Sequence, residues 1–298
     1  MSYPENERMV LKVCKELKNQ GWKAAYTRIV SQDIVGLKNS ADIVYPNEAY
    51  DTQAVLDSAR AYAKEFERAG IPQDRYCIKI PSTEGIATLG TALFGLPQAI
   101  ACSQAGCLYI RPYLNEVKAH DDLKLWPNVE DPATQHTMSA RTLQILETYA
   151  RLYKETGKAQ PLLKQASFIT AKEAMAAGEH GCHSATISPQ ALDELSKLTY
   201  DGSKQPGEGK PKPSNVYAGY KTPTRLAEVS KVDPLAAAEI DAKIASPDIK
   251  YLANDGKVLQ KAIKADPVTS QRLDDALKLF ISGLLESKAK IEEWFEQV

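Results

Sequence analysis

One lysine lies inside an apolar run of the kind that forms a buried strand. The run is Tyr76-Cys77-Ile78-Lys79-Ile80, and Lys79 stands out there because lysine is almost never fully buried without a partner. Parallel α/β sheets present reactive groups at the carboxyl ends of their strands, and a neutral, desolvated amine attacks carbonyl groups to form an imine. The residues leave two interpretations open: an imine-forming amine, or a lysine that reaches water from an edge strand or pairs with Glu84.

Cysteine and histidine do not show the spacing of a metal site. The five cysteines form no CxxC pair, and reduced, buried thiols are the expected state of Cys14, Cys77, Cys102, Cys107 and Cys182. Two of the four histidines are three residues apart around a glycine, and the others stand apart, which is not a zinc pattern. The loosely Gly-rich segment 202–209 lacks the strand and helix that a phosphate loop requires. We therefore expect no metal and no organic cofactor.

The elements that must position Lys79 read as short strands alternating with helices. Apolar spacing predicts helices over 7–20, 51–67, 96–105 and 138–155, one through 176, and one beginning at Pro189. Short apolar runs predict strands at 41–45, 76–80, 87–93, 108–111, 165–168 and 186–188. This alternation is the βαβ rhythm of a parallel sheet.

The C-terminal third has a different composition. Residues 201–223 are rich in Gly, Pro, Lys and Ser and too poor in apolar residues to pack a core, so they read as a flexible loop. Helices are expected around 233–245 and 255–265 and over 268–297. The broad apolar face of the last helix must dock on the rest of the domain or on a second subunit, as in a homodimer.

Composition restricts the partners. The chain has 298 residues, 43% of them apolar and 25% charged, and its 37 basic residues nearly balance its 38 acidic ones. No basic surface for nucleic acid or for a membrane follows from this balance. The polar N-terminal segment and the absence of a long apolar stretch predict a cytoplasmic protein without a membrane span.

Several motifs occur in the order found in one enzyme family. They are Ile78-Lys79-Ile80-Pro81-Ser82-Thr83-Glu84-Gly85-Ile86, Thr91-Ala92-Leu93-Phe94, Gln98-Ala99-Ile100-Ala101-Cys102-Ser103-Gln104-Ala105-Gly106, Ile110-Arg111-Pro112-Tyr113 and Ala166-Ser167-Phe168. Over roughly residues 40 to 200 this series resembles the transaldolases, which are class I, Schiff-base aldolases. The resemblance implies one α/β domain over 1–298, a (β/α)₈ TIM-type barrel with additional C-terminal helices in 224–298.

The resemblance also implies a reaction. A transaldolase transfers or cleaves a dihydroxyacetone unit between sugar phosphates in the non-oxidative pentose phosphate pathway. Lys79 would form the iminium with a ketose, and Thr91 would be the hydroxyl partner of the acid/base machinery. The residues expected to bind substrate are Ser82, Thr83, Arg111, Tyr113 and Ser167.

The acid/base carboxylate of the family is replaced. Ile43 stands where the catalytic glutamate is expected, and Asp42 beside it points to the opposite face of a strand. Glu84, just past the lysine strand, is the nearest remaining carboxylate, either in that role or as a solvated loop residue or helix cap. Asp42 and Glu84 are therefore the candidates for proton transfer.

Other departures concern the phosphate site and the barrel itself. Glu116 and Ile169 occupy the positions of the two phosphate-binding arginines, and Arg111 either compensates for them or pairs with Glu116. Too few residues precede Asp42 for two of the family's β/α units, so the barrel is expected to be incomplete at its N-terminus. These departures leave two alternatives open: an unphosphorylated carbonyl substrate in specialised metabolism, or a non-catalytic barrel with a binding role.

Overall fold

The computed structural model describes residues 52–68, 79–81, 89–199, 215–236 and 245–295. Contacts within the chain define two units, one formed by residues 1–89 and 277–298 and the other by residues 90–276. The predicted strand at 41–45, with Asp42, lies outside the described residues, as do Ser82, Thr83 and Glu84. Within the described part, no helix has both the length and the apolar character needed to cross a bilayer.

The first unit contains the lysine strand. Helix α3 (Thr52–Arg68) confirms the helix predicted over 51–67, and strand β1 (Lys79–Pro81) follows it. Lys79 is thus on a strand, as predicted, at the first of its three residues. Helix α10 (Pro267–Phe295) belongs to this unit from Leu277 onward.

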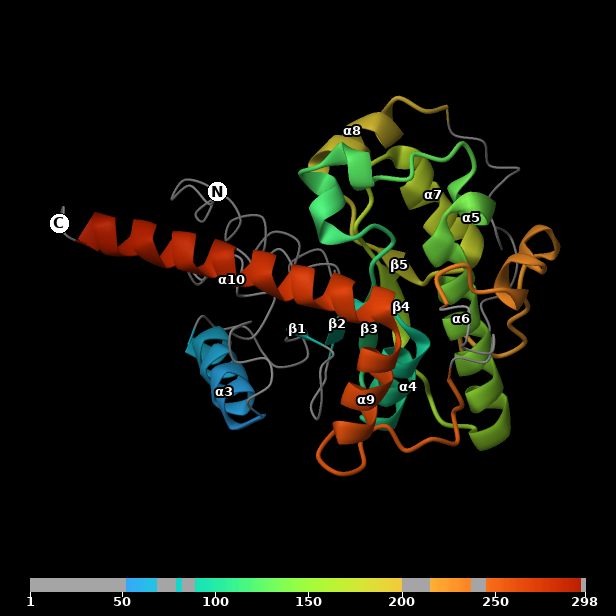
Figure 1. The fold of residues 1–298 in the computed structure, drawn as a ribbon, viewed down its shortest axis with the longest axis horizontal. Coiled ribbons are helices and arrows are strands. Elements are labelled where there is room, and N and C mark those ends of the chain that lie inside the picture. The colour runs from blue at the N-terminus through green and yellow to red at the C-terminus, as the bar shows by residue number, and fades with distance from the viewer. Residues whose placement is uncertain (1–51, 69–78, 82–88, 200–214, 237–244, 296–298) are drawn as a thin grey trace. The chain divides into compact units, whose positions relative to one another are not determined.

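The second unit is a sheet covered by helices. Strands β2 (Leu89–Leu93), β3 (Tyr109–Pro112), β4 (Leu162–Gln165) and β5 (Ser184–Ala185) lie side by side in chain order, and β3, β4 and β5 are parallel. The connecting helices are α4 (Leu96–Gln104), α5 (Pro132–Gln135), α6 (Thr137–Thr156) and α7 (Ala171–His180), followed by α8 (Pro189–Ser196) (Figure 1). The βαβ rhythm is confirmed.

Shorter elements complete the second unit. Two 3₁₀ turns, η3 (Val117–His120) and η4 (Leu123–Leu125), follow β3. The turns η6 (Thr224–Leu226) and η7 (Val229–Lys231) and helix α9 (Lys257–Ala265) precede α10. The packing of η7 against α6 and of α9 against α4 places the C-terminal segment on the helical layer.

Local signals set the helix ends. Helix α6 begins where the Nδ1 atom of His136 accepts the Met138 amide at 3.2 Å, and it ends at Gly157, whose φ of 67° is left-handed. A capping box between Thr170 and Glu173 begins α7. The Ser188 side chain accepts the Ala191 amide at the start of α8. These ends agree with the sequence patterns within a few residues.

The structure corrects several boundaries. Strand β4 ends at Gln165, and the strand predicted over 165–168 is wrong, because Ser167 has a φ of 68° that an extended strand does not allow. Strand β5 precedes the predicted segment 186–188. No helix covers residues 233–236. Within the predicted loop 201–223, residues 215–223 are irregular but bury Tyr217, which donates to the Pro161 carbonyl.

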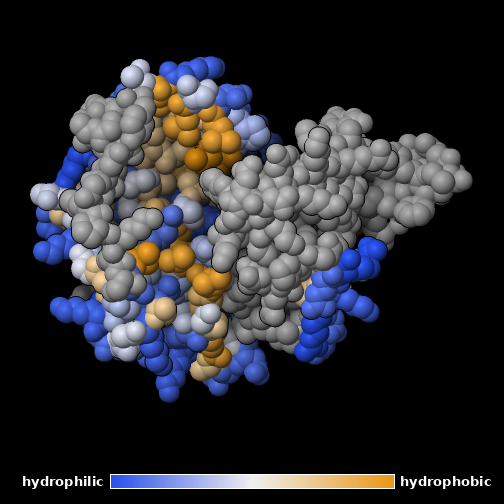
Figure 2. Space-filling model, turned by 180° about the vertical axis from the view of Figure 1, so that it is seen from behind, coloured by the Kyte–Doolittle hydropathy of each residue, from blue (hydrophilic) through white to orange (hydrophobic). Residues whose placement is uncertain are grey.

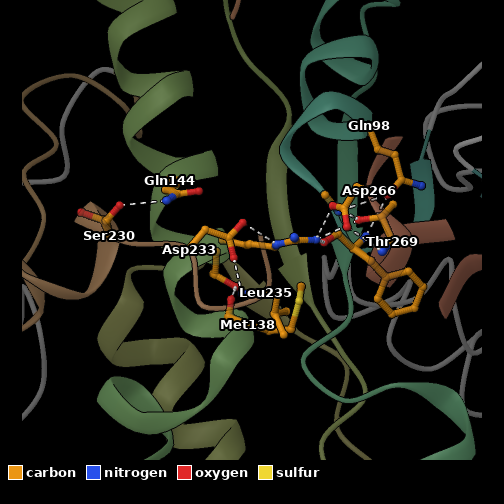
Figure 3. A network of polar contacts seen from close by, with 12 residues as sticks. Gln98, Met138, Gln144, Ser230, Asp233, Leu235, Asp266 and Thr269 are labelled. Atoms are coloured by element: carbon orange, nitrogen blue, oxygen red, sulfur yellow. Dashed lines mark hydrogen bonds and ion pairs between the residues drawn. The ribbon is translucent and has the colours of Figure 1, made fainter. Parts of the chain in front are cut away.

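A buried arginine ties α10 to the rest of the second unit. Arg141 of α6 is 1% exposed and its Nε donates to Asp233 at 2.9 Å. Its Nη1 lies 2.8 Å from Asp266 and donates to Thr269 at 2.8 Å and to the Phe94 carbonyl at 2.7 Å. We call Arg141, Asp233, Asp266 and Thr269 the Arg141 cluster (Figure 3). It joins α6, the loop after β2 and the start of α10.

Apolar residues also reach the surface. On the face drawn in Figure 2, apolar residues of the described part come to the surface in more than one place, with polar residues between them. Large apolar side chains of the second unit that are more than 40% exposed include Leu108, Leu123, Met175, Leu192, Leu198, Val216 and Val232. Cys102 and Cys107 are buried free thiols, as predicted, and Cys182 is a half-buried one.

Candidate functional site

Two predicted site residues meet on neighbouring strands. Thr91 of β2 is fully buried, and its Oγ1 lies 3.2 Å from the hydroxyl of Tyr113, which follows β3. The Tyr113 ring packs edge-on against Phe94 at 5.6 Å between centroids, and the guanidinium of Arg111 lies 5.7 Å from its centre. Thr91, Tyr113 and Arg111 are therefore brought together, and the two hydroxyls are held in one orientation.

Ser167 lies one strand further along, paired with a histidine that the sequence did not single out as a site residue. The Nε2 atom of His120, on η3, is 2.8 Å from the Ser167 hydroxyl. Burial lowers the pKa of His120 below its ordinary value, against the opposing effect of Glu173 and Asp121. The neutral imidazole can either accept a hydrogen bond from this hydroxyl or donate one to it, depending on its tautomer.

One carboxylate organises the segments that follow β3 and β4. Glu173, 2% exposed, accepts from the Asn115 amide at 2.9 Å, the Ile169 backbone N–H at 2.6 Å and the Trp126 indole at 2.7 Å. The Asn115 amide also donates to the Ser167 carbonyl at 2.9 Å. Because these donors occupy both oxygens, Glu173 acts as an anchor and not as a proton carrier.

Two histidines of the second unit, His136 and His180, are buried. Burial, with the nearby Arg272 and His180, lowers the pKa of His136 to about 4. Its Nδ1 accepts from the Met138 amide, so its protonated Nε2 donates to the Asn115 side-chain oxygen at 3.2 Å. Burial likewise lowers the pKa of His180 to about 4. Both rings are neutral at neutral pH and serve as fixed hydrogen-bond partners.

The predicted site residues are divided between the two units, and some of them lie outside the described residues. Lys79 lies on β1 in the first unit, whereas Thr91, Arg111, Tyr113 and Ser167 belong to the second. Asp42, Ser82, Thr83 and Glu84 lie outside the described residues. Among the described residues, no three His, Cys, Asp or Glu side chains are grouped to hold a metal ion.

Sequence reasoning missed His120, Asn115 and Glu173 as members of this site. Glu173 had a signal, since Thr170 and Glu173 have the spacing of a capping box. His120 and Asn115 had none, because their partners are 47 and 58 residues away in the chain. The second unit is thus a parallel α/β structure whose hydroxyl, imidazole and amide groups gather after its strands, as in the (β/α)₈ barrels.

The protein belongs to the transaldolase family: residues 6–289 match the model of the family described as Transaldolase/Fructose-6-phosphate aldolase. The fold of this family is the (β/α)₈ barrel, and the parallel sheet with its covering helices agrees with it. The family and fold predicted from the motifs are confirmed.

Similar proteins carry the same family name. The chain is 29% identical to a transaldolase of Thermosynechococcus vestitus over 252 residues, which are 79% of this chain and 53% of that protein. It is 32% identical to one of Prochlorococcus marinus over 181 residues (55% and 50%) and 33% identical to one of Mannheimia succiniciproducens over 185 residues (56% and 55%). The chain spans about half the length of the curated relatives it matches.

Proposed function

We propose that the protein is a transaldolase-like enzyme that forms a Schiff base between Lys79 and a ketose and transfers or cleaves a dihydroxyacetone-type unit. The observation that carries this proposal is the position of Lys79 on a strand within the family match. The name of the matched family supports a sugar phosphate as substrate. The same match favours this function over a specialised carbonyl substrate or a non-catalytic barrel.

The proposed chemistry needs few groups. The neutral Lys79 amine attacks the ketose carbonyl, water leaves, and the iminium nitrogen accepts electrons as the neighbouring carbon–carbon bond breaks. A proton must leave the substrate hydroxyl in that step, and Asp42 and Glu84 remain the carboxylate candidates for accepting it. The Thr91–Tyr113 hydroxyl pair would hold the acid/base water or substrate hydroxyl in place.

The proposal is tested by reductive trapping. The protein is incubated with fructose 6-phosphate and borohydride, and the modified lysine is mapped by peptide mass spectrometry. We expect an adduct on Lys79 and loss of that adduct in Lys79→Met. A chain that remains unmodified with both fructose 6-phosphate and dihydroxyacetone would contradict the proposed function.

The mapping step has to separate two strand lysines. Lys164 lies on β4 and is half-buried, so it is the other lysine in the described strands that could react. An exposed lysine such as Lys197 serves as the control for non-specific reduction. An adduct shared equally among these lysines would indicate unspecific chemistry and would refute a dedicated amine at Lys79.

A further inference from the structure

The segment that joins β4 to α7 has an unusual backbone conformation at Ser167. Strand β4 ends at Gln165, helix α7 begins at Ala171, and Ser167 between them has a φ of 68°. This left-handed region costs a residue other than glycine about 1–2 kcal/mol. Such a conformation persists only where the surrounding structure holds it, and it is frequent at functional sites. The contacts around Ser167 therefore need an explanation.

Hydrogen bonds on both sides hold the backbone of Ser167. The backbone N–H of Asn115 donates to the Ser167 carbonyl at 3.2 Å, and the Asn115 side-chain amide donates to the same oxygen at 2.9 Å. This amide also donates to Glu173 at 2.9 Å, and Glu173 accepts the backbone N–H of Ile169 at 2.6 Å. The segments after β3 and β4 are thus joined around Ser167, and they fix the position of its Cβ atom.

The Ser167 hydroxyl is paired with an imidazole. His120 is the last residue of η3, and its Nε2 atom lies 2.8 Å from the Ser167 Oγ. The turn itself is held by Ala119, which is fully buried, and by a 2.8 Å ion pair between Lys118 and Asp275 of α10. Ser167 is half-buried, whereas His120 is exposed. The pair therefore connects a hydroxyl after β4 with bulk water.

This pair lies at the strand ends that also carry Tyr113. Ala166, the residue before Ser167, is the parallel partner of Tyr113. The hydroxyl of Tyr113 lies 3.2 Å from the Oγ1 atom of Thr91. Because α/β barrels carry out their reactions at the carboxyl ends of the strands, the Ser167–His120 pair is at the end of the sheet where the proposed reaction would take place.

The charges near His120 leave its ring able to gain and lose a proton. Loss of hydration lowers its pKa below 6.5, while the carboxylates of Glu173 on α7 and of Asp121 beside it raise the pKa. Lys118, on the same turn, is paired with Asp275. A base that works at neutral pH has to be unprotonated there but close to its titration range, and this imidazole meets that requirement.

We propose that Ser167 and His120 form a proton relay for the cleavage of the substrate's carbon–carbon bond. The relay rests on the proposed function, because it acts on a ketose already bound as the iminium on Lys79. In the cleavage step the substrate hydroxyl gives its proton to the Ser167 Oγ, and Ser167 gives its own proton to the Nε2 atom of His120. The electrons of the broken bond move to the iminium nitrogen.

No serine alkoxide forms in this step, because Ser167 gains one proton as it loses another. The neutral ring must carry its own proton on Nδ1, so that Nε2 is free to accept. The imidazolium that results returns the proton along the same path when the three-carbon unit bonds to an acceptor aldehyde. Neither Asp42 nor Glu84 then has to accept the proton, which is how the relay differs from the carboxylate candidates.

The test measures the first turnover of the full chain. Saturating fructose 6-phosphate is added without an acceptor aldehyde, and the release of glyceraldehyde 3-phosphate is followed at a series of pH values. The wild-type rate should fall with acid below pH 6.5, as His120 becomes protonated. His120→Ala should lower the rate about a hundredfold at neutral pH, leave the half-saturating concentration unchanged and lose this fall with acid.

Added imidazole separates proton transfer from a structural role. Because His120 is exposed, free imidazole can reach the space that His120→Ala leaves, and it should raise the rate of this variant about tenfold. Ser167→Ala breaks the path before the imidazole and should not respond. Asp121→Asn should shift the fall with acid to lower pH, because this carboxylate raises the pKa of His120. Lys124→Met, at an exposed residue of η4, is the control and should behave as the wild type does.

Borohydride trapping of dihydroxyacetone keeps the relay distinct from the proposed function. This ketone forms the imine without any cleavage, so its adduct on Lys79 should be the same in wild type and His120→Ala. Normal trapping with an unchanged cleavage rate in His120→Ala, with a loss that imidazole does not restore, or with no cleavage by the wild type would overturn the relay alone. A wild type that traps no carbonyl compound would refute the proposed function and the relay with it.

Discussion

The Arg141 cluster and the row that Arg111, Lys164 and Ser184 form across β3, β4 and β5 both carry charge in the second unit, but their neighbours in the structure differ. Arg141 lies between two carboxylates and also donates to Thr269 and a backbone carbonyl. In the row of Arg111, Lys164 and Ser184, the register of the strands places two cations at facing positions, and each of them has further interactions. Charges of opposite sign in direct contact, as around Arg141, are typical of a structural anchor, although the Nη2 atom of Arg141 has no hydrogen-bond partner in the described part of the chain.

The largest effect on stability is expected at Arg141. Arg141→Met removes the cation and leaves Asp233 and Asp266, 5% and 3% exposed, without their shared partner. Breaking a buried ion pair on one side costs about 3–5 kcal/mol, so the free energy of unfolding should fall by that amount. Urea unfolding followed by circular dichroism measures it. Arg151→Met, at an exposed arginine of the same helix, is the control; equal effects in the two variants would contradict an anchor role.

Acid should lower the free energy of unfolding, because His136 and His180 are buried as neutral rings. The pKa of His136 and that of His180 are both lowered to about 4, against about 6.5 in the unfolded chain. Between these values the unfolded state binds more protons, so stability is full above pH 6.5 and is lost as the pH falls toward 4. Between pH 6.5 and pH 5, each histidine should lower the free energy of unfolding by about 2 kcal/mol.

Unfolding at a series of pH values tests this prediction. His136→Asn should flatten the dependence by roughly one histidine's share, although it lowers stability at pH 7. The same slope in wild type and variant would show that His136 is protonated in the folded state as readily as in the unfolded one.

An intermediate effect on stability is expected at Glu173, whose buried carboxylate accepts hydrogen bonds from neutral N–H donors. Glu173→Gln replaces an oxygen that accepts hydrogen bonds with an NH₂ group that faces N–H donors. We expect a loss of about 2 kcal/mol, since hydrogen bonds to charged groups contribute about 1.5–3 kcal/mol each. Thermal unfolding measures the loss. A variant as stable as the wild type would mean that the carboxylate is not held by these donors in solution.

The smallest effect on stability is expected at Lys164 of β4. Lys164→Met makes the same chemical change as Arg141→Met, from a cation to an apolar chain, but at a half-buried position instead of a fully buried one. Its stability in chloride should differ from the wild type by less than about 1 kcal/mol. If Lys164→Met were as destabilising as Arg141→Met, Lys164 would be a structural cation and the contrast between the two clusters would disappear.

The sequence predicted the parts of the fold that depend on local pattern. Helices α3, α4, α6, α7 and α10 follow apolar periods that can be read directly, and α6 and α7 also have capping residues; Lys79, Thr91 and Tyr113 were proposed as site residues through the motifs around them. Strand β4 was misplaced because the left-handed backbone at Ser167 has no signature in a serine. Tyr217 was assigned to a loop because its partner, the Pro161 carbonyl, is 56 residues away.

The sequence singled out Arg111 but did not predict which residues lie beside it, and it gave no sign of the Arg141 cluster. Asp233 follows Arg141 by 92 residues, and no sequence pattern marks such a pair. Lys164 and Ser184 lie just before the strands that the sequence predicts at 165–168 and 186–188, and their relation to Arg111 depends on the register between strands. Register depends on the packing of the whole sheet, so a single sequence does not give it.

The hydrogen bond between Trp126 and Glu173 offers an optical consequence. The chain has three tryptophans, and Trp126 lies against a buried carboxylate that also binds the residues after β3 and β4. A protein in which Trp22 and Trp294 are replaced by phenylalanine would emit from this one indole. Its emission wavelength and quenching would then report, without any added label, whether the contact between Trp126 and Glu173 changes when a substrate binds.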